Sequence, residues 1–432
     1  MIIRPAKSVN GVVSIPGDKS ISHRAAIIAA MAKGESRIEN FLTGEDCAST
    51  IGCLRQLGVQ IEQDGRTVVV QGVGKAGFRK PNEPLDCGNS GTTMRLLAGI
   101  LAGQNFESVL TGDRSLCQRP MNRIIKPLRA MGAEIDSNEG KAPLTIRGKN
   151  PLRAIQYEMP IASAQVKSCL LFAGLNADGK TTVIEPVQTR DHTERMLQGF
   201  GGDISVAESA EGRTISVLSQ MHLSARDMMI PADISSAAFF IVAAACTKDS
   251  TLELPNVGIN PTRTAIFDVL ADLGAEIELS DRSESCGEPA ARLKITGSGG
   301  QTSPNPVKIT GDKTASLIDE IPILAVFGTQ IEAGVEIRDA AELRVKESDR
   351  ISAIVENLRR MNADVKEFED GFRVERSQLI GAEVDSFGDH RIAMAFAVAG
   401  LFAQGETTIV NPECADISFP GFYETLESVV RR

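Results

Sequence analysis

The octapeptide LRAMGAEI, residues 128–135, carries the pattern that decides the fold, because near copies of it recur along the chain. Each copy begins with leucine, places Gly or Asn at its fifth position and ends on an apolar residue. The copies are LRQLGVQI (54–61), LRAMGAEI (128–135), LQGFGGDI (197–204), LADLGAEI (270–277) and LRRMNADV (358–365). Their spacings of 74, 69, 73 and 88 residues indicate one structural unit that is used repeatedly.

Each copy closes an amphipathic helix. Apolar residues recur with i, i+3, i+4, i+7 spacing over 121–131 and again over 351–361. The Gly or Asn that follows is expected to end the helix. An alternating strand, a turn such as Asp64-Gly65 or Asp370-Gly371, and a second strand come next.

A second series of helices precedes the first. Its members are apolar on all sides, which predicts burial, and each leads into a capped turn and a strand. They begin AAIIAAMAKG, RLLAGILAGQ, SCLLFAGLNA, AAFFIVAAAC, PILAVFGTQI and AMAFAVAGLF. The repeating unit is therefore β-α-β-α-β-β, about 70 residues long, with buried helices inside and sheets outside.

The sixth copy stops after its second helix, FYETLESVVRR. We expect its missing strands to come from the N-terminus, where IIRPAKSV and GVVSIPG are strand-like. This predicts a discontinuous domain of residues 1–17 plus 234–432 and a second domain of residues 18–233, each with three units.

Composition bounds the function. With 432 residues and 42% hydrophobic content, the chain can bury more than one core. A net charge of −10, two Tyr and no Trp argue against a nucleic-acid surface. No segment approaches the roughly 18 apolar residues of a membrane span, and the N-terminus lacks a signal-peptide core, so we expect a cytoplasmic protein. The eight cysteines and four histidines show no metal-ligand spacing, which indicates neither a disulfide framework nor a metal site.

The stretch GDKSISHR, residues 17–24, stands where the first buried helix begins. Gly17 and Asp18 can turn the chain, and Ser20 or Ser22 is expected to cap the helix. Lys19 and Arg24 then add positive charge to a helix N-terminus, which favours an anion. A nucleotide-binding P-loop is excluded, because five residues separate the glycines and Asp18 precedes Lys19.

The other buried helices have comparable starts: GNSGTTMR (88–95), SAQVKS (163–168), ADISSAA (232–238), DEIP (319–322) and GDHR (388–391). Internal duplication of ordinary caps would explain the likeness but not the cations, which are Lys19, Arg24, Arg95, Lys167 and Arg391. Two further stretches, GDRSLCQRPMNR (112–123) and RVKESDR (344–350), are dense in charge. We therefore expect two sets of helix starts to line an inter-domain cleft with positive potential.

These motifs, in this order and along the whole chain, closely resemble the 5-enolpyruvylshikimate-3-phosphate (EPSP) synthase family. The resemblance implies an α/β fold, the two-domain inverse α/β barrel with three βαβαββ units in each domain. It also implies transfer of the enolpyruvyl group of phosphoenolpyruvate to the 5-hydroxyl of shikimate 3-phosphate, with release of phosphate and without a metal or organic cofactor. Glyphosate is implied as an inhibitor, and the chain is expected to be a monomer without membrane or nucleic-acid partners.

The resemblance also assigns residues. Those implied to hold shikimate 3-phosphate are Lys19, Ser20, Arg24, Ser163, Ala164, Gln165, Arg190, Asp319 and Lys346. Those implied to hold phosphoenolpyruvate are Lys19, Asn89, Gly91, Thr92, Arg119, Gln165, Arg350 and Arg391. Proton transfer is implied for Asp319, Glu347 and Lys19.

Two positions depart from the pattern of some relatives. Ala164 stands where some have a second serine, and Ile417 stands where others have a lysine before Phe-Pro. UDP-N-acetylglucosamine enolpyruvyl transferase is the nearest alternative, but its signature cysteine lies five residues before Arg-Pro, whereas Cys117 lies two before Arg119. A non-catalytic anion-binding homologue remains the other alternative, although it would have no reason to keep Asp319 and Glu347.

Overall fold

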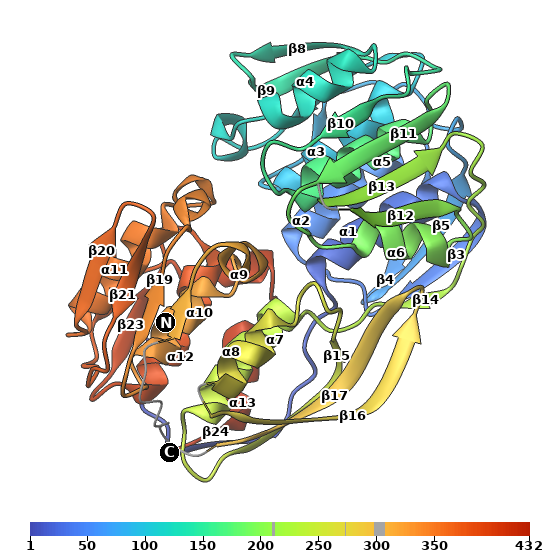
Figure 1. Ribbon diagram of the computed structural model, residues 1–432. Coiled ribbons are helices and arrows are strands. Elements are labelled where there is room, and N and C mark those ends of the chain that lie inside the picture. The colour runs from blue at the N-terminus through green and yellow to red at the C-terminus, as the bar shows by residue number, and fades with distance from the viewer. Residues whose placement is uncertain (210–211, 273, 298–306) are drawn as a thin grey trace. The chain divides into compact units, whose positions relative to one another are not determined.

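The computed structural model describes residues 1–209, 212–272, 274–297 and 307–432. The chain divides into two compact units (Figure 1). Unit 1 comprises Met1–Pro16, Pro231–Ser283 and Pro289–Arg432, and unit 2 comprises Gly17–Ile230 and Glu284–Glu288. Position 273, within the predicted repeat copy 270–277, lies outside the described residues.

Unit 2 contains sheets that share one strand order. In each sheet the first two strands are parallel and the others pair antiparallel. The first sheet has the order β14 (Met228–Met229), β3 (Lys33–Glu39), β5 (Thr67–Val73), β4 (Gln60–Asp64). The second has the order β6 (Leu85–Asp86), β7 (Glu107–Thr111), β9 (Lys141–Arg147), β8 (Glu134–Asn138). The third has the order β10 (Gln156–Glu158), β11 (Lys180–Glu185), β13 (Gly212–Leu218), β12 (Ile204–Ser209).

The sheets of unit 1 follow the same plan with additions at the chain ends. One sheet has the order β16 (Glu276–Ser285), β17 (Glu288–Thr296), β15 (Thr251–Gly258), β2 (Ser8–Val12), β24 (Val430–Arg431). Another has the order β18 (Val307–Ile309), β19 (Val335–Ile337), β21 (Gly371–Val374), β20 (Val365–Phe368). A further sheet has the order β1 (Ile2–Ile3), β23 (Thr407–Val410), β22 (Glu383–Asp385). The recurring order in both units confirms the predicted repeating unit.

The N-terminal strands do not both complete the sixth copy. β1 pairs with β23 there, as predicted, but β2 pairs in parallel with β15 of the fourth copy. The reason lies in β14, which precedes the fourth buried helix in sequence but pairs with β3 of the first copy. Among the described residues, the segment before the fourth buried helix forms only an isolated parallel bridge with β15, Ala232 to Val257, and β2 lies between β15 and β24, where its backbone groups are satisfied.

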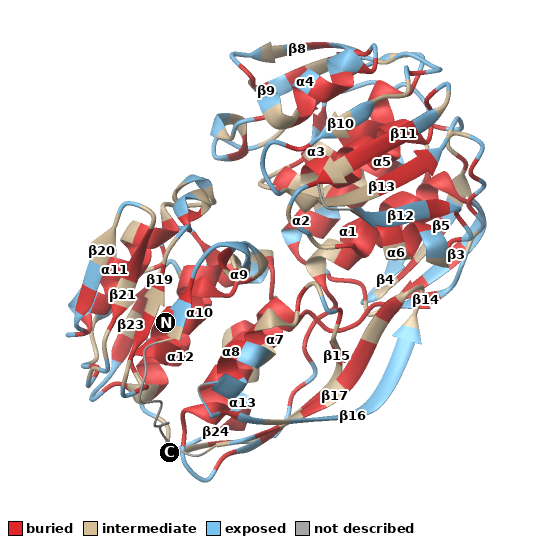
Figure 2. Ribbon diagram, in the orientation of Figure 1, coloured by how far each residue is buried: buried red, intermediate tan, exposed pale blue. Residues whose placement is uncertain are grey.

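The apolar helices are buried, as predicted (Figure 2). In unit 2, α3 packs against both α1 and α5, and in unit 1 the helices α7, α10 and α12 contact one another. Burial of these uniformly apolar surfaces away from water is the main driving force for each core. The helices are α1 (Lys19–Met31), α3 (Gly91–Ala102), α5 (Ala164–Gly174), α7 (Ile234–Ala245), α10 (Ile321–Gly328) and α12 (His390–Phe402).

The second series consists of amphipathic helices that end where the repeats predict. After five of them the repeated Gly or Asn has a positive φ, a left-handed conformation that glycine and asparagine adopt most readily. These residues are Gly58 (89°), Gly132 (102°), Gly201 (84°), Gly274 (81°) and Asn362 (64°). The helices are α2 (Glu45–Gln56), α4 (Asn122–Ala130), α6 (His192–Gly199), α8 (Ala265–Asp272), α11 (Arg350–Arg360) and α13 (Phe422–Val429).

Short helical turns complete the inventory: η1 (Leu116–Gln118), α9 (Asp312–Ser316), η2 (Ala341–Val345) and η3 (Pro412–Ile417). Among the residues described, no helix combines the length and the apolar character that crossing a membrane requires.

Candidate active site

The first predicted anion site lies at the start of α1 in unit 2. The capping residue is Asp18, whose Oδ1 accepts a hydrogen bond of 2.9 Å from the backbone N–H of Ile21, so the prediction of Ser20 or Ser22 was wrong. Ser22 is instead buried and accepts from the backbone N–H of Leu42. Lys19 is the first helical residue, and its Nζ lies 3.0 Å from Oδ2 of Asp46 on α2.

Arg24, one turn further along α1, is almost wholly buried. Its Nε donates to Thr193 Oγ1 at 2.8 Å, and its Nη2 donates to Ser168 Oγ at 2.9 Å. Nη1 donates to the backbone carbonyl of Ser20. Burial lowers the pKa of Arg24 to about 10, an effect that the nearby Glu194 carboxylate partly opposes. The guanidinium therefore keeps its charge at neutral pH while it joins α1, α5 and α6.

The start of α3 is linked to Gln165 on α5. Ser90 caps α3, and Gly91 and Thr92 are its first residues. The side-chain amide of Gln165 donates to Thr92 Oγ1 at 2.9 Å, and its carbonyl oxygen accepts from Arg95 Nη1 at 2.7 Å. The structure thus brings two of the predicted phosphoenolpyruvate residues, Thr92 and Gln165, into direct contact.

Arg119 follows η1 and lies against the same loop. Its Nη2 donates to Asn89 Oδ1 at 2.7 Å, while Asn89 donates in turn to Asp113 at 2.6 Å. A Cβ at Gly91 would lie 3.5 Å from Nη1 of Arg119, so this guanidinium reaches the start of α3. Asn89, Gly91 and Arg119 are therefore neighbours in unit 2.

The remaining predicted residues of unit 2 stand at the start of α5 and before α6. Ser163 caps α5 through the backbone N–H of Val166, and Ala164 is the first helical residue. Arg190 lies in the connection between β11 and α6 and is partly exposed. Its charge is close enough to Arg24 to contribute to lowering the pKa of that residue.

Lys167 does not join the cations at the helix starts, although the sequence placed it among them. Its side chain has 0% exposed surface, and its Nζ lies 3.0 Å from Glu185 and 2.6 Å from Glu194. Because α5 places Lys167 on a face that packs into the core, its charge is compensated by two carboxylates.

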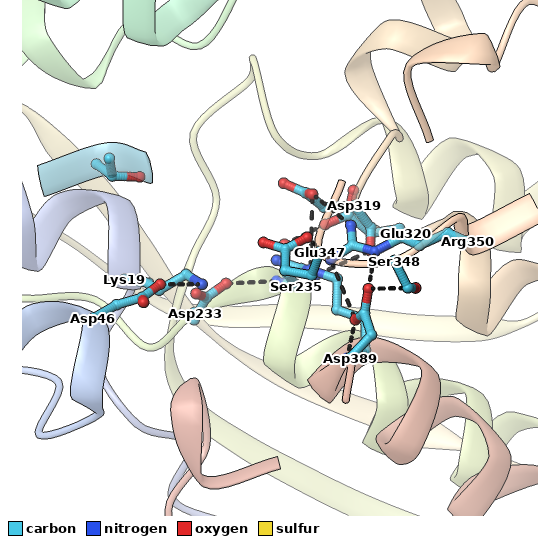
Figure 3. Close-up of polar contacts among 12 residues, drawn as sticks. Lys19, Asp46, Asp233, Ser235, Asp319, Glu320, Glu347, Ser348, Arg350 and Asp389 are labelled. Carbon is cyan, nitrogen blue, oxygen red and sulfur yellow. Dashed lines mark hydrogen bonds and ion pairs between the residues drawn. The ribbon is translucent and has the colours of Figure 1, made fainter. Parts of the chain in front are cut away.

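Unit 1 gathers the predicted catalytic carboxylates around Arg350 (Figure 3). Arg350 is 1% exposed, and its Nε lies 2.7 Å from Oδ2 of Asp389, the residue that caps α12. Nη2 lies 2.6 Å from Oε2 of Glu347, and Nη1 lies 3.5 Å from Oδ1 of Asp319. Arg391 also reaches Asp319, with its Nε 3.7 Å from Oδ1 and its Nη1 donating to the backbone carbonyl.

Electrostatics in this cluster follow from burial and from the dense carboxylates. Burial alone would lower the pKa of Arg350, but Asp389, Glu347 and Asp319 outweigh it and raise that pKa. Burial lowers the pKa of Lys346, against the attraction of Asp319 and Glu347. Arg350 is therefore held as a permanent cation, while Lys346 is a more easily deprotonated amine.

Sequence reasoning missed Asp46 and Asp389, which orient predicted residues, and it named Arg95 among the cations at the helix starts without assigning it to either substrate. Asp389 stands in the motif GDHR and Arg95 stands in GNSGTTMR, but neither motif indicates which side chain its residue contacts. Asp46 stands in the first turn of α2, where an acidic residue has an ordinary capping explanation. Within the described part of the chain, His, Cys, Asp and Glu form no group of three or more suited to a metal ion.

The sequence is similar to that of known proteins along almost its whole length. The family model of EPSP synthase (3-phosphoshikimate 1-carboxyvinyltransferase) matches residues 3–426. A 3-phosphoshikimate 1-carboxyvinyltransferase from Solibacter usitatus is 50% identical over 429 residues, covering 99% of both chains. The enzyme of that name from Citrifermentans bemidjiense is 48% identical over 433 residues, covering 100% of this chain and 99% of its own.

A solved structure of EPSP synthase from Acinetobacter baumannii has a TM-score of 0.87 and 42% sequence identity, and the match covers 99% of this chain and 97% of that one. This likeness confirms the predicted fold class. The matches extend over both units and over every motif from which the family resemblance was inferred. The chain belongs to the EPSP synthase family.

Proposed function

We propose that this chain transfers the enolpyruvyl group of phosphoenolpyruvate to the 5-hydroxyl of shikimate 3-phosphate. The observation that carries the proposal is the position of Asp319, whose carboxylate lies within 3.5–3.7 Å of Arg350 and Arg391. A carboxylate held by two cations at the start of a buried helix suits proton transfer next to bound anions.

The reaction is an addition followed by an elimination. The 5-hydroxyl oxygen bonds to C2 of phosphoenolpyruvate, C3 gains a proton, and the hydroxyl loses one. C3 then loses a proton, the C2–O bond to phosphate breaks, and the double bond re-forms in the product. One group must accept the hydroxyl proton and another must deliver a proton to C3.

We assign the hydroxyl proton to Asp319. Neighbouring guanidinium groups favour the ionised form of a carboxylate, which is the form that accepts a proton. Asp319 also precedes α10 (Ile321–Gly328), whose N-terminus further favours negative charge.

The proton donor for C3 is Glu347 or Lys19. Glu347 is named by the family resemblance, but its 2.6 Å contact with Arg350 favours the carboxylate and opposes an acid role. Lys19 is a cation beside Asp46 and carries protons to donate. Comparing the kcat of Glu347→Gln with that of Lys19→Met at saturating substrates separates the two, because loss of the acid lowers kcat, whereas loss of the proposed binding contacts of Lys19 raises the KM values.

The other proposed residues neutralise and orient the substrates. Arginine forks suit carboxylate and phosphate oxygens, and helix N-termini add unpaired N–H groups. For phosphoenolpyruvate we propose Lys19, Asn89, Gly91, Thr92, Arg119, Gln165, Arg350 and Arg391. For shikimate 3-phosphate we propose Lys19, Ser20, Arg24, Ser163, Ala164, Gln165, Arg190, Asp319 and Lys346.

The proposal requires residues of both units to serve one pair of substrates, in a cleft between domains of residues 18–233 and of residues 1–17 plus 234–432. The family resemblance and the division of the proposed residues between the two units support it. We further propose a cytoplasmic monomer that glyphosate inhibits at the phosphoenolpyruvate site.

The test is to mix the purified chain with both substrates, measure phosphate release and identify the enol ether product by NMR. Release that requires shikimate 3-phosphate supports the proposal. Release with UDP-N-acetylglucosamine in its place would assign the chain to the alternative transferase. Binding of both substrates without release would make it a non-catalytic homologue.

A further inference from the structure

Lys167 is a charged side chain that none of the proposed roles uses. It lies on α5 two residues after Gln165, and its side chain has no exposed surface. Its Nζ lies 3.0 Å from Oε2 of Glu185 and 2.6 Å from Oε1 of Glu194, and both glutamates are buried. The three side chains form an ion triad within unit 2, and Nη1 of Arg213 lies 4.0 Å from Oε1 of Glu185.

Such a triad is a poor way to gain stability. Removing charges from water is costly, and an apolar side chain of similar size often serves at least as well. A buried ion triad does fix geometry, because each charge tolerates only arrangements in which its partners stay close. The segments that the triad fixes are those that its two glutamates contact.

Glu185 extends the triad to the connection that carries Arg190. Its Oε2 accepts a hydrogen bond of 3.2 Å from the backbone N–H of Thr189 and one of 2.7 Å from Thr189 Oγ1. Thr189 directly precedes Arg190 in the segment between β11 and α6. Lys167 thus holds Glu185, and Glu185 holds the residue next to Arg190.

The other carboxylate leads to Arg24. Glu194 lies on α6 directly after Thr193, which accepts from Arg24 Nε at 2.8 Å. Ser168, directly after Lys167, accepts from Arg24 Nη2 at 2.9 Å. The residues that hold the Arg24 guanidinium are thus the immediate neighbours of two triad members.

We propose that Lys167 is a positioning residue for the acceptor substrate: through Glu185 and Glu194 it fixes the placement of Arg190 and Arg24. The inference rests on the proposed function, in which both arginines hold shikimate 3-phosphate. The donor residues at the start of α3 and on the 112–123 loop have no contact with the triad among the interactions described above. The effect of Lys167 should therefore fall on one substrate.

The first test is Thr189→Val, which removes one hydrogen bond to Glu185 and keeps the side-chain size. The KM for shikimate 3-phosphate should rise by about 10-fold, since small misplacement of binding groups is costly. The KM for phosphoenolpyruvate at saturating shikimate 3-phosphate should change by less than about 2-fold. Thr182→Val is the matched control, because Thr182 lies on the same strand, β11, and within the described part of the chain its hydroxyl forms a hydrogen bond with Ser216 and none with the triad.

The second test is Lys167→Met, alone and combined with Thr189→Val. Lys167→Met should raise the same KM by ~10–100-fold. Because both changes act through Glu185, the double variant should raise the KM by clearly less than the product of the single effects. Should Lys167→Met fail to fold, the comparison of Thr189→Val with Thr182→Val decides alone.

Three results would overturn the proposal. They are a lower melting temperature with an unchanged KM, an equal rise of KM for both substrates, and multiplicative effects in the double variant. The unsubstituted chain distinguishes this failure from that of the proposed function. If the unsubstituted chain turns over both substrates and Thr189→Val behaves like Thr182→Val, only the positioning role of Lys167 is refuted. If the unsubstituted chain shows no turnover, both the proposed function and the positioning role are refuted.

Discussion

One oxygen of Asp319 lies 3.5 Å from Nη1 of Arg350 and 3.7 Å from Nε of Arg391. Both guanidinium groups also have other fixed partners, Asp389 for Arg350 and the backbone carbonyl of Asp319 for Arg391. The carboxylate is therefore held in place from two directions. This geometry supports a base at this position more than an acid.

Replacing Asp319 with Asn should lower kcat by about 10²–10⁴ and change the KM values only modestly. The amide keeps the size of the side chain but cannot accept the hydroxyl proton. Steady-state kinetics of phosphate release measure the effect. The exposed Asp312→Asn on α9 provides a control for loss of one negative charge in the same unit. Near-normal turnover in Asp319→Asn would place the base elsewhere.

Substituting Gly91 with Ala should weaken glyphosate more than phosphoenolpyruvate. A Cβ there would lie 2.6 Å from Nη1 of Arg95, so this guanidinium must give way, and it would lie in van der Waals contact, at 3.5 Å, with Nη1 of Arg119. Glyphosate is the longer of the two ligands, and one misplaced methyl group typically discriminates by ~1–3 kcal/mol. The inhibition constant should therefore rise by at least about 10-fold more than the KM.

Gly52→Ala is the matched control for this experiment, because a Cβ at Gly52 on α2 meets no atom within 4 Å. It should leave both constants unchanged. Equal inhibition constants for the unsubstituted chain and Gly91→Ala would show that Gly91 does not face the donor site.

The stability of the protein should fall in mild acid because of His23. Burial lowers the pKa of His23 from 6.5 to about 3, although Asp46 partly opposes this. Above pH 6.5 the ring is neutral in both folded and unfolded chains, and this contribution to stability is fully present. Below that pH only the unfolded chain takes up the proton, so the free energy of unfolding falls by about 1.4 kcal/mol per pH unit from this group.

Denaturant titrations between pH 7 and pH 4 measure this slope. In His23→Gln the slope should be shallower by about one proton, and the exposed His222→Gln is the matched control. Identical slopes for His23→Gln and the unsubstituted chain would contradict the assignment.

Shikimate 3-phosphate alone should make the molecule more compact. The proposed contacts of this substrate come from both units, so binding should draw the units together. Small-angle X-ray scattering with and without the substrate tests this through the radius of gyration. An unchanged radius with saturating shikimate 3-phosphate would count against a shared cleft.

The sequence predicted those features that depend on local conformation or on repetition. Gly58 and Asn362 end their helices in the left-handed conformation, and only a few residue types adopt it readily. The cap of α1 was predicted wrongly, because Asp18, Ser20 and Ser22 are all good capping types and the choice depends on the backbone.

Features that depend on tertiary contacts could not be predicted in this way. The cation Lys167 looked like Lys19 in sequence, but its environment is set by Glu185 and Glu194, which lie 18 and 27 positions further along the chain. The pairing of β2 with β15 likewise depends on β15 having a side that is free to accept a parallel strand, and the sequence of β2 alone gives no information about β15.

The pairing of the N-terminal strands also determines the order in which the chain can fold during synthesis. β1 and β2 leave the ribosome first, but their partners β15, β23 and β24 lie between Thr251 and Arg431. All strands of the unit 2 sheets lie between Lys33 and Met229. The sheets of unit 2 can therefore form while translation continues. In contrast, β2 can pair with β15 only after Thr251–Gly258 has been made, β1 must wait for β23 at Thr407–Val410, and the sheet that contains β2 is complete only when β24 has been made.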